Sequence, residues 1–151
     1  MLPSLLIGSV LLFINMVIQV VALLFIIDYL LRRINAKRMT PGFRTDITVM
    51  GVVLMILFVG HELQFAVWAA LFVYLGEFPS YETAFYHSVV NFTSLGYGDI
   101  VMSEKWRLLG ALEAANGILM FGLTASSFIG VMTRLFARHQ DIVDVIQNKQ
   151  K

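Results

Sequence analysis

The chain has 151 residues, of which 58% are hydrophobic and 14% charged, and its mean hydropathy is +0.79. This composition excludes an ordinary soluble domain and indicates an integral membrane protein surrounded by lipid. The net charge of +1 favours neither nucleic acid nor any other charged partner. Because the chain has no cysteine, a disulfide framework and a thiolate metal site are both excluded.

Residues 5–27 form an apolar run that is long enough to cross the core of a bilayer. A cleaved signal peptide is the alternative, but no basic residue precedes the run and no small-residue cleavage site follows it. We therefore expect a first transmembrane helix, followed by a basic loop that contains the turn residues Thr40, Pro41 and Gly42. The helix and the loop together form an N-terminal segment at residues 1–45.

Two further apolar runs predict an outer helix at residues 47–76 and an inner helix at residues 106–136. Of the 11 basic residues, five lie in the first loop and four at or after the end of the inner helix, which leaves only Lys105 and Arg107 in between. Since basic residues gather on the cytoplasmic side, we expect the N-terminus outside and the C-terminus in the cytoplasm. The expected membrane is the plasma (inner) membrane of a prokaryote. Residues 137–151 are then a cytoplasmic tail that either extends the inner helix or frays.

The segment between the outer and inner helices predicts a short helix at residues 81–93. Ser80 is a favourable N-cap, and Glu82 in the first turn suits the positive end of the helix dipole. A helix of this length spans about 20 Å, which is too short for a bilayer core of about 30 Å. We expect it to enter the membrane and return, with the negative end of its dipole favouring a cation at mid-membrane.

Residues 93–99 follow this helix and read Thr-Ser-Leu-Gly-Tyr-Gly-Asp. The stretch resembles the selectivity filter of potassium channels, which usually reads Thr-Val-Gly-Tyr-Gly-Asp. Its last four residues match outright, whereas Ser94 stands where the family has threonine and Leu95 where it has valine or isoleucine. The resemblance extends from Tyr81 to about Ala125 and is greatest to the small bacterial two-helix channels, here with an additional N-terminal helix.

The resemblance implies a pore domain at residues 46–136 with its filter at residues 94–98. In such a filter, rings of backbone carbonyls replace the hydration shell of the ion. The implied ion-binding residues are Ser94, Leu95, Gly96, Tyr97 and Gly98, with the Ser94 hydroxyl completing the innermost site. One loop per chain implies a homotetramer with fourfold cyclic symmetry. No cofactor is expected, and potassium is the permeant ligand.

Further residues are expected to support the filter or to line the cavity below it. The support residues are Thr93, Asp99, Tyr86, His87 and Glu113, with Tyr86 expected to brace Asp99. For His87 three alternatives stay open, namely a bond to Tyr97 of a neighbouring subunit, a pair with Glu113, or a water partner in a space-filling role. The cavity residues share one face of the inner helix, and they are Ile118, Phe121, Gly122, Ala125 and Ile129. Gly117 and Gly122 either form a hinge or permit close helix packing.

Polar residues also interrupt the first two transmembrane helices at comparable depth. They are Asn15, Gln19, His61, Glu62 and Gln64. Hydrogen bonds between helices would explain how the additional helix docks on a pore domain. Alternatively, His61 and Glu62 sense protons.

The sequence therefore predicts an all-α membrane protein with three transmembrane helices, a re-entrant pore helix and a filter loop, assembled as a tetrameric pore. The predicted function is a potassium-selective channel that conducts passively, and not an enzyme. The alternatives are a weakly selective cation channel and a non-conducting membrane scaffold subunit.

Overall fold

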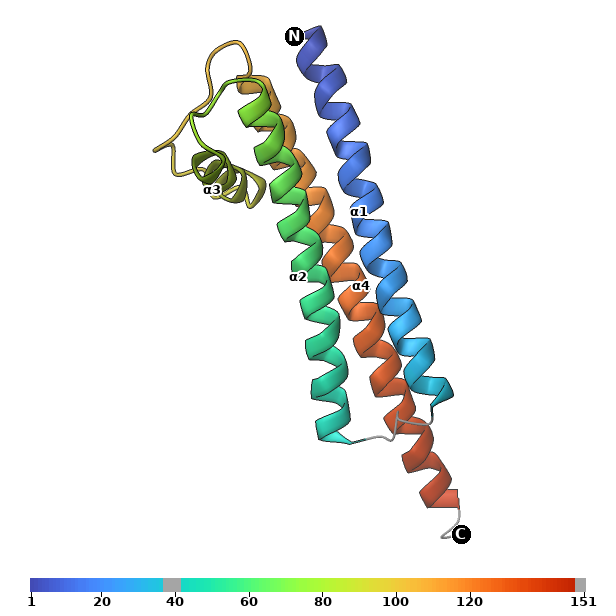
Figure 1. Cartoon of the computed structure of the whole chain (residues 1–151). Coiled ribbons are helices and arrows are strands. Elements are labelled where there is room, and N and C mark those ends of the chain that lie inside the picture. The colour runs from blue at the N-terminus through green and yellow to red at the C-terminus, as the bar shows by residue number, and fades with distance from the viewer. Residues whose placement is uncertain (37–41, 149–151) are drawn as a thin grey trace.

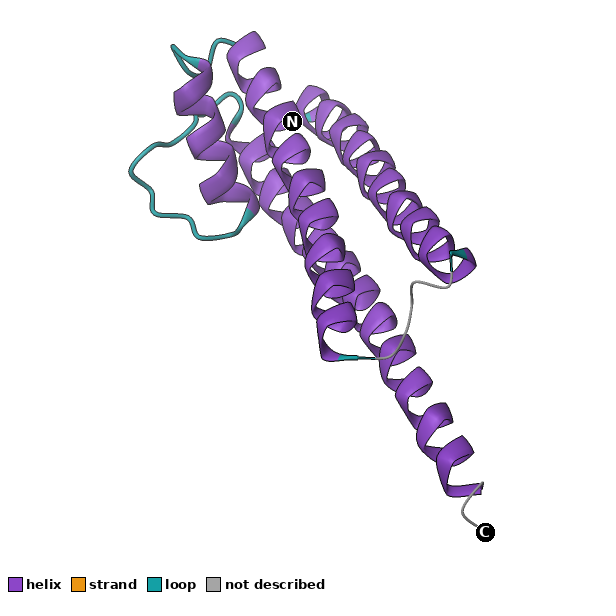
Figure 2. Ribbon diagram, turned by 60° about the horizontal axis from the view of Figure 1, so that its bottom comes forward, coloured by secondary structure: helices purple, strands orange, loops and turns teal. Residues whose placement is uncertain are grey.

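The computed structural model describes residues 1–36 and 42–148, and their regular structure is entirely helical. The helices are α1 (Leu2–Asn35), α2 (Phe43–Tyr74), α3 (Tyr81–Phe92) and α4 (Arg107–Asn148). Helices α1, α2 and α4 run side by side, and α3 lies beside the end of the bundle that also holds the N-terminus (Figures 1 and 2). Within the described residues, three helices are long and apolar enough to cross a membrane, which confirms the predicted fold class for a single chain.

The long helices extend beyond the apolar runs that predicted them. Helix α1 continues through Arg32, which pairs with Asp28 at 2.7 Å on the same helix face. Helix α4 continues past residue 136 to Asn148, so the first part of the expected tail is helical. The difference arises because hydropathy marks the part of a helix that lies in lipid, whereas hydrogen bonding continues into polar flanks. The predicted turn at Thr40 and Pro41 lies outside the described residues.

Helix α3 has the ends that the sequence predicted to within one residue. The Ser80 hydroxyl accepts a hydrogen bond from the Thr83 backbone N–H at 3.2 Å, which confirms the N-cap. Thr93 is the C-cap, and its hydroxyl donates back to the carbonyl of Val89 at 2.7 Å. The helix has 12 residues, so it ends well short of a full membrane crossing.

Aromatic side chains fix α3 against the two neighbouring helices. Phe92 at the end of α3 packs edge-on against Phe65 of α2, with ring centroids 5.0 Å apart, and against Phe121 of α4 at 5.8 Å. Phe92 is fully buried. Burial of a phenylalanine side chain contributes roughly 1.5–3 kcal/mol, so these contacts are a main anchor of α3.

Glycine allows α4 to approach the end of α3 more closely than any other residue would. A Cβ atom at Gly117 would overlap the carbonyl oxygen of Phe92, whereas nothing lies within 4 Å of a Cβ at Gly122. Of the two roles left open for these glycines, close packing is therefore the one that the contacts of Gly117 support. The contacts of Gly122 distinguish neither role.

We expect Gly117→Ala to lower the free energy of unfolding by about 1–3 kcal/mol, because the atom it meets is backbone and cannot rotate away. The matched control is Gly122→Ala, which adds the same methyl group to open space on the same helix. Thermal melting in detergent, followed by tryptophan fluorescence, measures both. Equal melting temperatures for the two variants would contradict the close-packing role.

Candidate functional site

The backbone of residues 93–99 reverses its hand at every second residue. The angle φ is positive at Ser94 (59°), Gly96 (58°) and Gly98 (73°), but not at the two residues between them. This alternation in the sign of φ keeps the stretch from forming either a helix or a regular strand. Only glycine adopts positive φ without strain, which explains the alternate glycines.

Ser94 is the one non-glycine residue with positive φ among the described residues. A β-branched residue is a genuine outlier in this region, since its second Cβ substituent crowds the backbone. Serine therefore suits this backbone better than the threonine of the motif that the stretch resembles. It keeps the hydroxyl and loses the methyl group.

The N–H groups at the start of the stretch bond back to the last turn of α3. Ser94 N–H donates to the carbonyl of Asn91 at 2.9 Å. The N–H groups of Leu95 and Gly96 both donate to the carbonyl of Val90, at 3.0 and 3.3 Å. The N–H groups of residues 94–96 thus have partners within the chain. The carbonyls of residues 94–97 accept no hydrogen bond from the part of the chain that the structure describes. These carbonyls remain available to a cation.

All residues from 93 to 99 are exposed in a single chain. Leu95 is 55% exposed and Tyr97 67% exposed, although both side chains are large. Irregular backbone that lies within a membrane must be covered by protein or line a water-filled path. In a single chain, Leu95 and Tyr97 are not covered in this way.

Two side-chain contacts hold the outer end of the stretch. The Tyr86 hydroxyl donates to Asp99 Oδ2 at 2.8 Å, as the sequence predicted, and this bond raises the pKa of Tyr86 above its usual value. Glu77 accepts two hydrogen bonds of 2.7 Å from Ser103, one from its N–H and one from its hydroxyl. The sequence did not predict the second contact, because Glu77 and Ser103 are joined only by the folding of the loop.

Glu113 binds Asn91, and not His87. The Glu113 side chain is fully buried, and its Oε2 accepts a hydrogen bond from Asn91 Nδ2 at 2.8 Å. His87 instead lies between the rings of Phe72 and Phe78, at centroid distances of 5.4 and 4.8 Å. The pair of His87 with Glu113 is absent from the described residues, because two aromatic rings enclose the imidazole. The alternatives of a neighbour's Tyr97 or a water molecule stay predictions.

The lower polar cluster forms a closed ring of hydrogen bonds between α1, α2 and α4. Gln19 donates to the Thr124 hydroxyl at 3.1 Å, and Thr124 contacts His61 Nε2 at 2.9 Å. His61 Nδ1 contacts Gln64 Oε1 at 3.3 Å, and Gln64 Nε2 donates to Gln19 Oε1 at 3.0 Å. With a neutral imidazole protonated on Nδ1, each side chain donates once and accepts once around the ring. We call these four residues the polar ring.

The polar ring joins the additional helix to both helices of the expected pore domain, as the docking hypothesis predicted. Gln64 Nε2 also reaches the backbone carbonyl of Asn15 at 3.5 Å, but the Asn15 side chain makes no hydrogen bond in the described residues, and Glu62 is not part of the ring. The sequence missed Thr124, because a single threonine in an apolar helix gives no signal until its partners are known. The proton-sensing hypothesis for His61 stays a prediction.

The predicted cavity residues share one exposed face of α4 in the single chain. Ile118 is 62% exposed and Ile129 57% exposed, so this face needs a partner or a water-filled space outside the chain.

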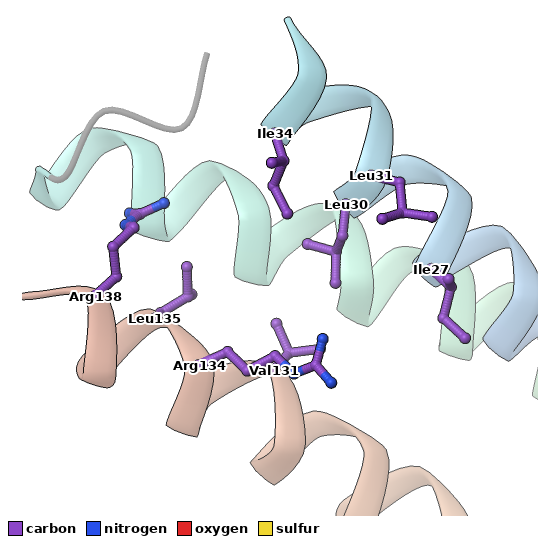
Figure 3. A pocket seen from close by; sticks show the side chains of 8 residues that line it. All are labelled: Ile27, Leu30, Leu31, Ile34, Val131, Arg134, Leu135 and Arg138. Carbon is purple, nitrogen blue, oxygen red and sulfur yellow. The ribbon is translucent and has the colours of Figure 1, made fainter. Parts of the chain in front are cut away.

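A separate cavity of about 560 Å³ opens between α1 and α4 near the other end of the bundle. Figure 3 shows that Leu30 and Leu135 line it together with Arg134. Its lining is mostly apolar, so it does not suit a hydrated ion.

Comparison with known proteins gave one match. The family model described as "Ion channel" matches residues 61–134. The matched residues comprise the second half of α2, the whole of α3, the stretch at 93–99 and α4 as far as Arg134. No curated protein and no solved structure matches the chain. Helix α1 lies outside the match.

We expect Tyr86→Phe to speed amide hydrogen exchange at residues 94–99 by roughly fivefold, since it removes one hydrogen bond worth about 1 kcal/mol from the outer end of the stretch. The matched control is Tyr74→Phe, because Tyr74 is 87% exposed and its hydroxyl makes no hydrogen bond in the described residues. Unchanged exchange in Tyr86→Phe would show that Asp99 is held by something else.

We expect Thr124→Val to lower the free energy of unfolding by about 1–3 kcal/mol, because it leaves Gln19 and His61 with unsatisfied buried polar atoms. The control is Thr133→Val, whose hydroxyl bonds only the Ile129 carbonyl of its own helix at 2.9 Å. Thermal melting measures both. If the two variants melt alike, the polar ring does not dock α1.

Proposed function

The chain belongs to the ion channel family through residues 61–134, and from this premise we propose that it is a potassium-selective channel that conducts passively. The observation that carries the proposal is the run of carbonyls at residues 94–97. Their own N–H groups are largely bonded to α3, and the sign of φ alternates along the stretch, from which we infer that the carbonyls face one side. Potassium selectivity requires a row of backbone oxygens of this kind.

The proposed mechanism uses the backbone for selectivity and α3 for attraction. The carbonyls of Ser94, Leu95, Gly96 and Tyr97 replace the hydration shell of the potassium ion as it passes. The Ser94 hydroxyl adds oxygen to the innermost site. The C-terminal end of α3 carries the negative end of its dipole, which favours a cation below the filter. Potassium is thus the permeant ligand, and no cofactor is required.

We propose a homotetramer, because one chain supplies one loop and a ring of oxygens needs several. The exposed Leu95 and Tyr97 support this, since an assembly would cover them. Cyclic symmetry places the same loop of each subunit around one axis. In this assembly the exposed face of α4 with Ile118 and Ile129 lines a cavity on the axis.

The proposed orientation follows the basic residues, with the N-terminus outside and the C-terminus in the cytoplasm. The proposed location is the plasma membrane of a prokaryote.

A less selective cation channel is the second candidate, and Ser94 is the observation that favours it. Without the methyl group of threonine, its side chain has more rotamer freedom, so the innermost site is less rigid.

We expect purified protein in liposomes to carry potassium and rubidium, and to carry sodium at least about tenfold more slowly. This corresponds to a preference of at least ~1.4 kcal/mol. Barium should block this flux. Gly96→Ala should reduce it, because a Cβ at a φ of +58° adds strain to a stretch that already carries one at Ser94. The control is Gly51→Ala, where the glycine lies within α2 and a Cβ meets nothing within 4 Å.

Equal fluxes of sodium and potassium would contradict the proposed selectivity and support the weakly selective channel. No flux under any gradient would contradict conduction altogether and support a scaffold subunit.

A further inference from the structure

Asn91 connects the filter to the inner helix. It lies in the last turn of α3, and its backbone carbonyl accepts the N–H of Ser94 at 2.9 Å. Its side-chain Nδ2 donates to two acceptors on α4, the carbonyl of Gly110 at 2.7 Å and Glu113 Oε2 at 2.8 Å. Asn91 thus bonds Ser94, the first proposed ion-binding residue, through its backbone carbonyl. Through its side chain it bonds two residues of α4.

Glu113 is an unusual residue for packing alone. Its side chain is fully buried inside a membrane-spanning helix, where an ionisable group is costly and needs a partner. Its Oε1 has no hydrogen-bond partner in the described residues, so the contact with Asn91 is its main bond. A leucine would fill the same place between α3 and α4 without this cost.

A second contact restrains the same end of α3. One turn further along α4, Gly117 lies directly against the carbonyl of Phe92. The last turn of α3 is therefore held at two successive turns of α4, by hydrogen bonds at Asn91 and by backbone contact at Phe92. Ser94 follows directly, so these contacts determine where its carbonyl and hydroxyl lie.

We propose that Asn91 and Glu113 form a positioning pair that sets the place of Ser94 and thereby the discrimination between potassium and sodium at the innermost ion site. The inference rests on the proposed potassium filter. Selectivity depends on the number and arrangement of the oxygens around the ion. If the pair is removed, Ser94 gains freedom and its oxygens can close around the smaller sodium ion.

The experiment measures the sodium-to-potassium flux ratio in liposomes together with thermal melting. Asn91→Leu keeps the approximate shape of the side chain and removes its two side-chain hydrogen bonds to α4. Its flux ratio should rise roughly tenfold, the order of change that loss of two side-chain hydrogen bonds produces. Glu113→Gln keeps an acceptor oxygen for Asn91 and should retain the ratio of the unchanged protein to within about twofold.

A double variant separates positioning from packing. Asn91→Leu combined with Glu113→Met replaces both partners by apolar groups of similar shape, so melting should return close to that of the unchanged protein. Its flux ratio should stay raised. The matched control is Gln19→Met, which breaks the polar ring away from the filter and should lower the melting temperature without changing the flux ratio.

The outcomes distinguish this inference from the function on which it rests. If the unchanged protein does not prefer potassium, the proposed function fails and the inference fails with it. If the unchanged protein prefers potassium and Asn91→Leu does too, only the inference is overturned. It is also overturned if the double variant regains both stability and selectivity, or if Glu113→Gln loses selectivity as fully as Asn91→Leu.

Discussion

Backbone that leaves the helical path inside a membrane must find its hydrogen-bond partners in protein, because lipid offers none. Residues 94–96 meet this requirement by bonding to the carbonyls of Asn91 and Val90. The last turn of α3 therefore supplies the acceptors for the stretch that follows it. The position of that turn determines the position of residues 94–96, so the placement of α3 is the condition for any function of this loop.

The rest of the bundle serves this placement in two layers. Around α3, aromatic packing centred on Phe92 and the glycine contact at Gly117 bring α2 and α4 against its end. Below it, the polar ring joins α1 to α2 and α4 through side-chain hydrogen bonds. The family match covers the first layer, whereas α1 lies outside the match and reaches it through Gln19. Helix α1 is thus attached to α4 at Thr124, which follows shortly after Gly122.

Features that depend on neighbouring residues could be predicted from the sequence. The cap at Ser80, the short length of α3 and the need for glycine at 96 and 98 are local consequences of hydrogen bonding and backbone sterics. The hydrogen bond of Tyr86 to Asp99 was also expected, but from the resemblance to potassium channels and not from neighbouring residues. The role of that bond in supporting a filter stays a prediction.

Features that depend on which helices face each other could not be predicted. Glu113 and His87 are both polar at similar depth, but the partner of Glu113 is Asn91, which no pattern in the sequence indicates. The ring likewise depends on Thr124, whose hydroxyl becomes informative only when α1 and α2 converge on it. The ends of the long helices differ from the predicted ones because apolar runs mark the extent of lipid and not the extent of the helix.

The central claim is that the carbonyls after α3 select potassium, and the reversal potential of current through a planar bilayer tests it most directly. With potassium chloride on both sides in a tenfold gradient, the account predicts a reversal potential close to about 59 mV, with the sign for a permeant cation. When sodium chloride replaces potassium chloride on one side, the reversal potential should become large. Its sign should be that of a membrane permeable to potassium and impermeable to sodium. A reversal potential near zero with potassium on one side and equal sodium on the other would contradict the account.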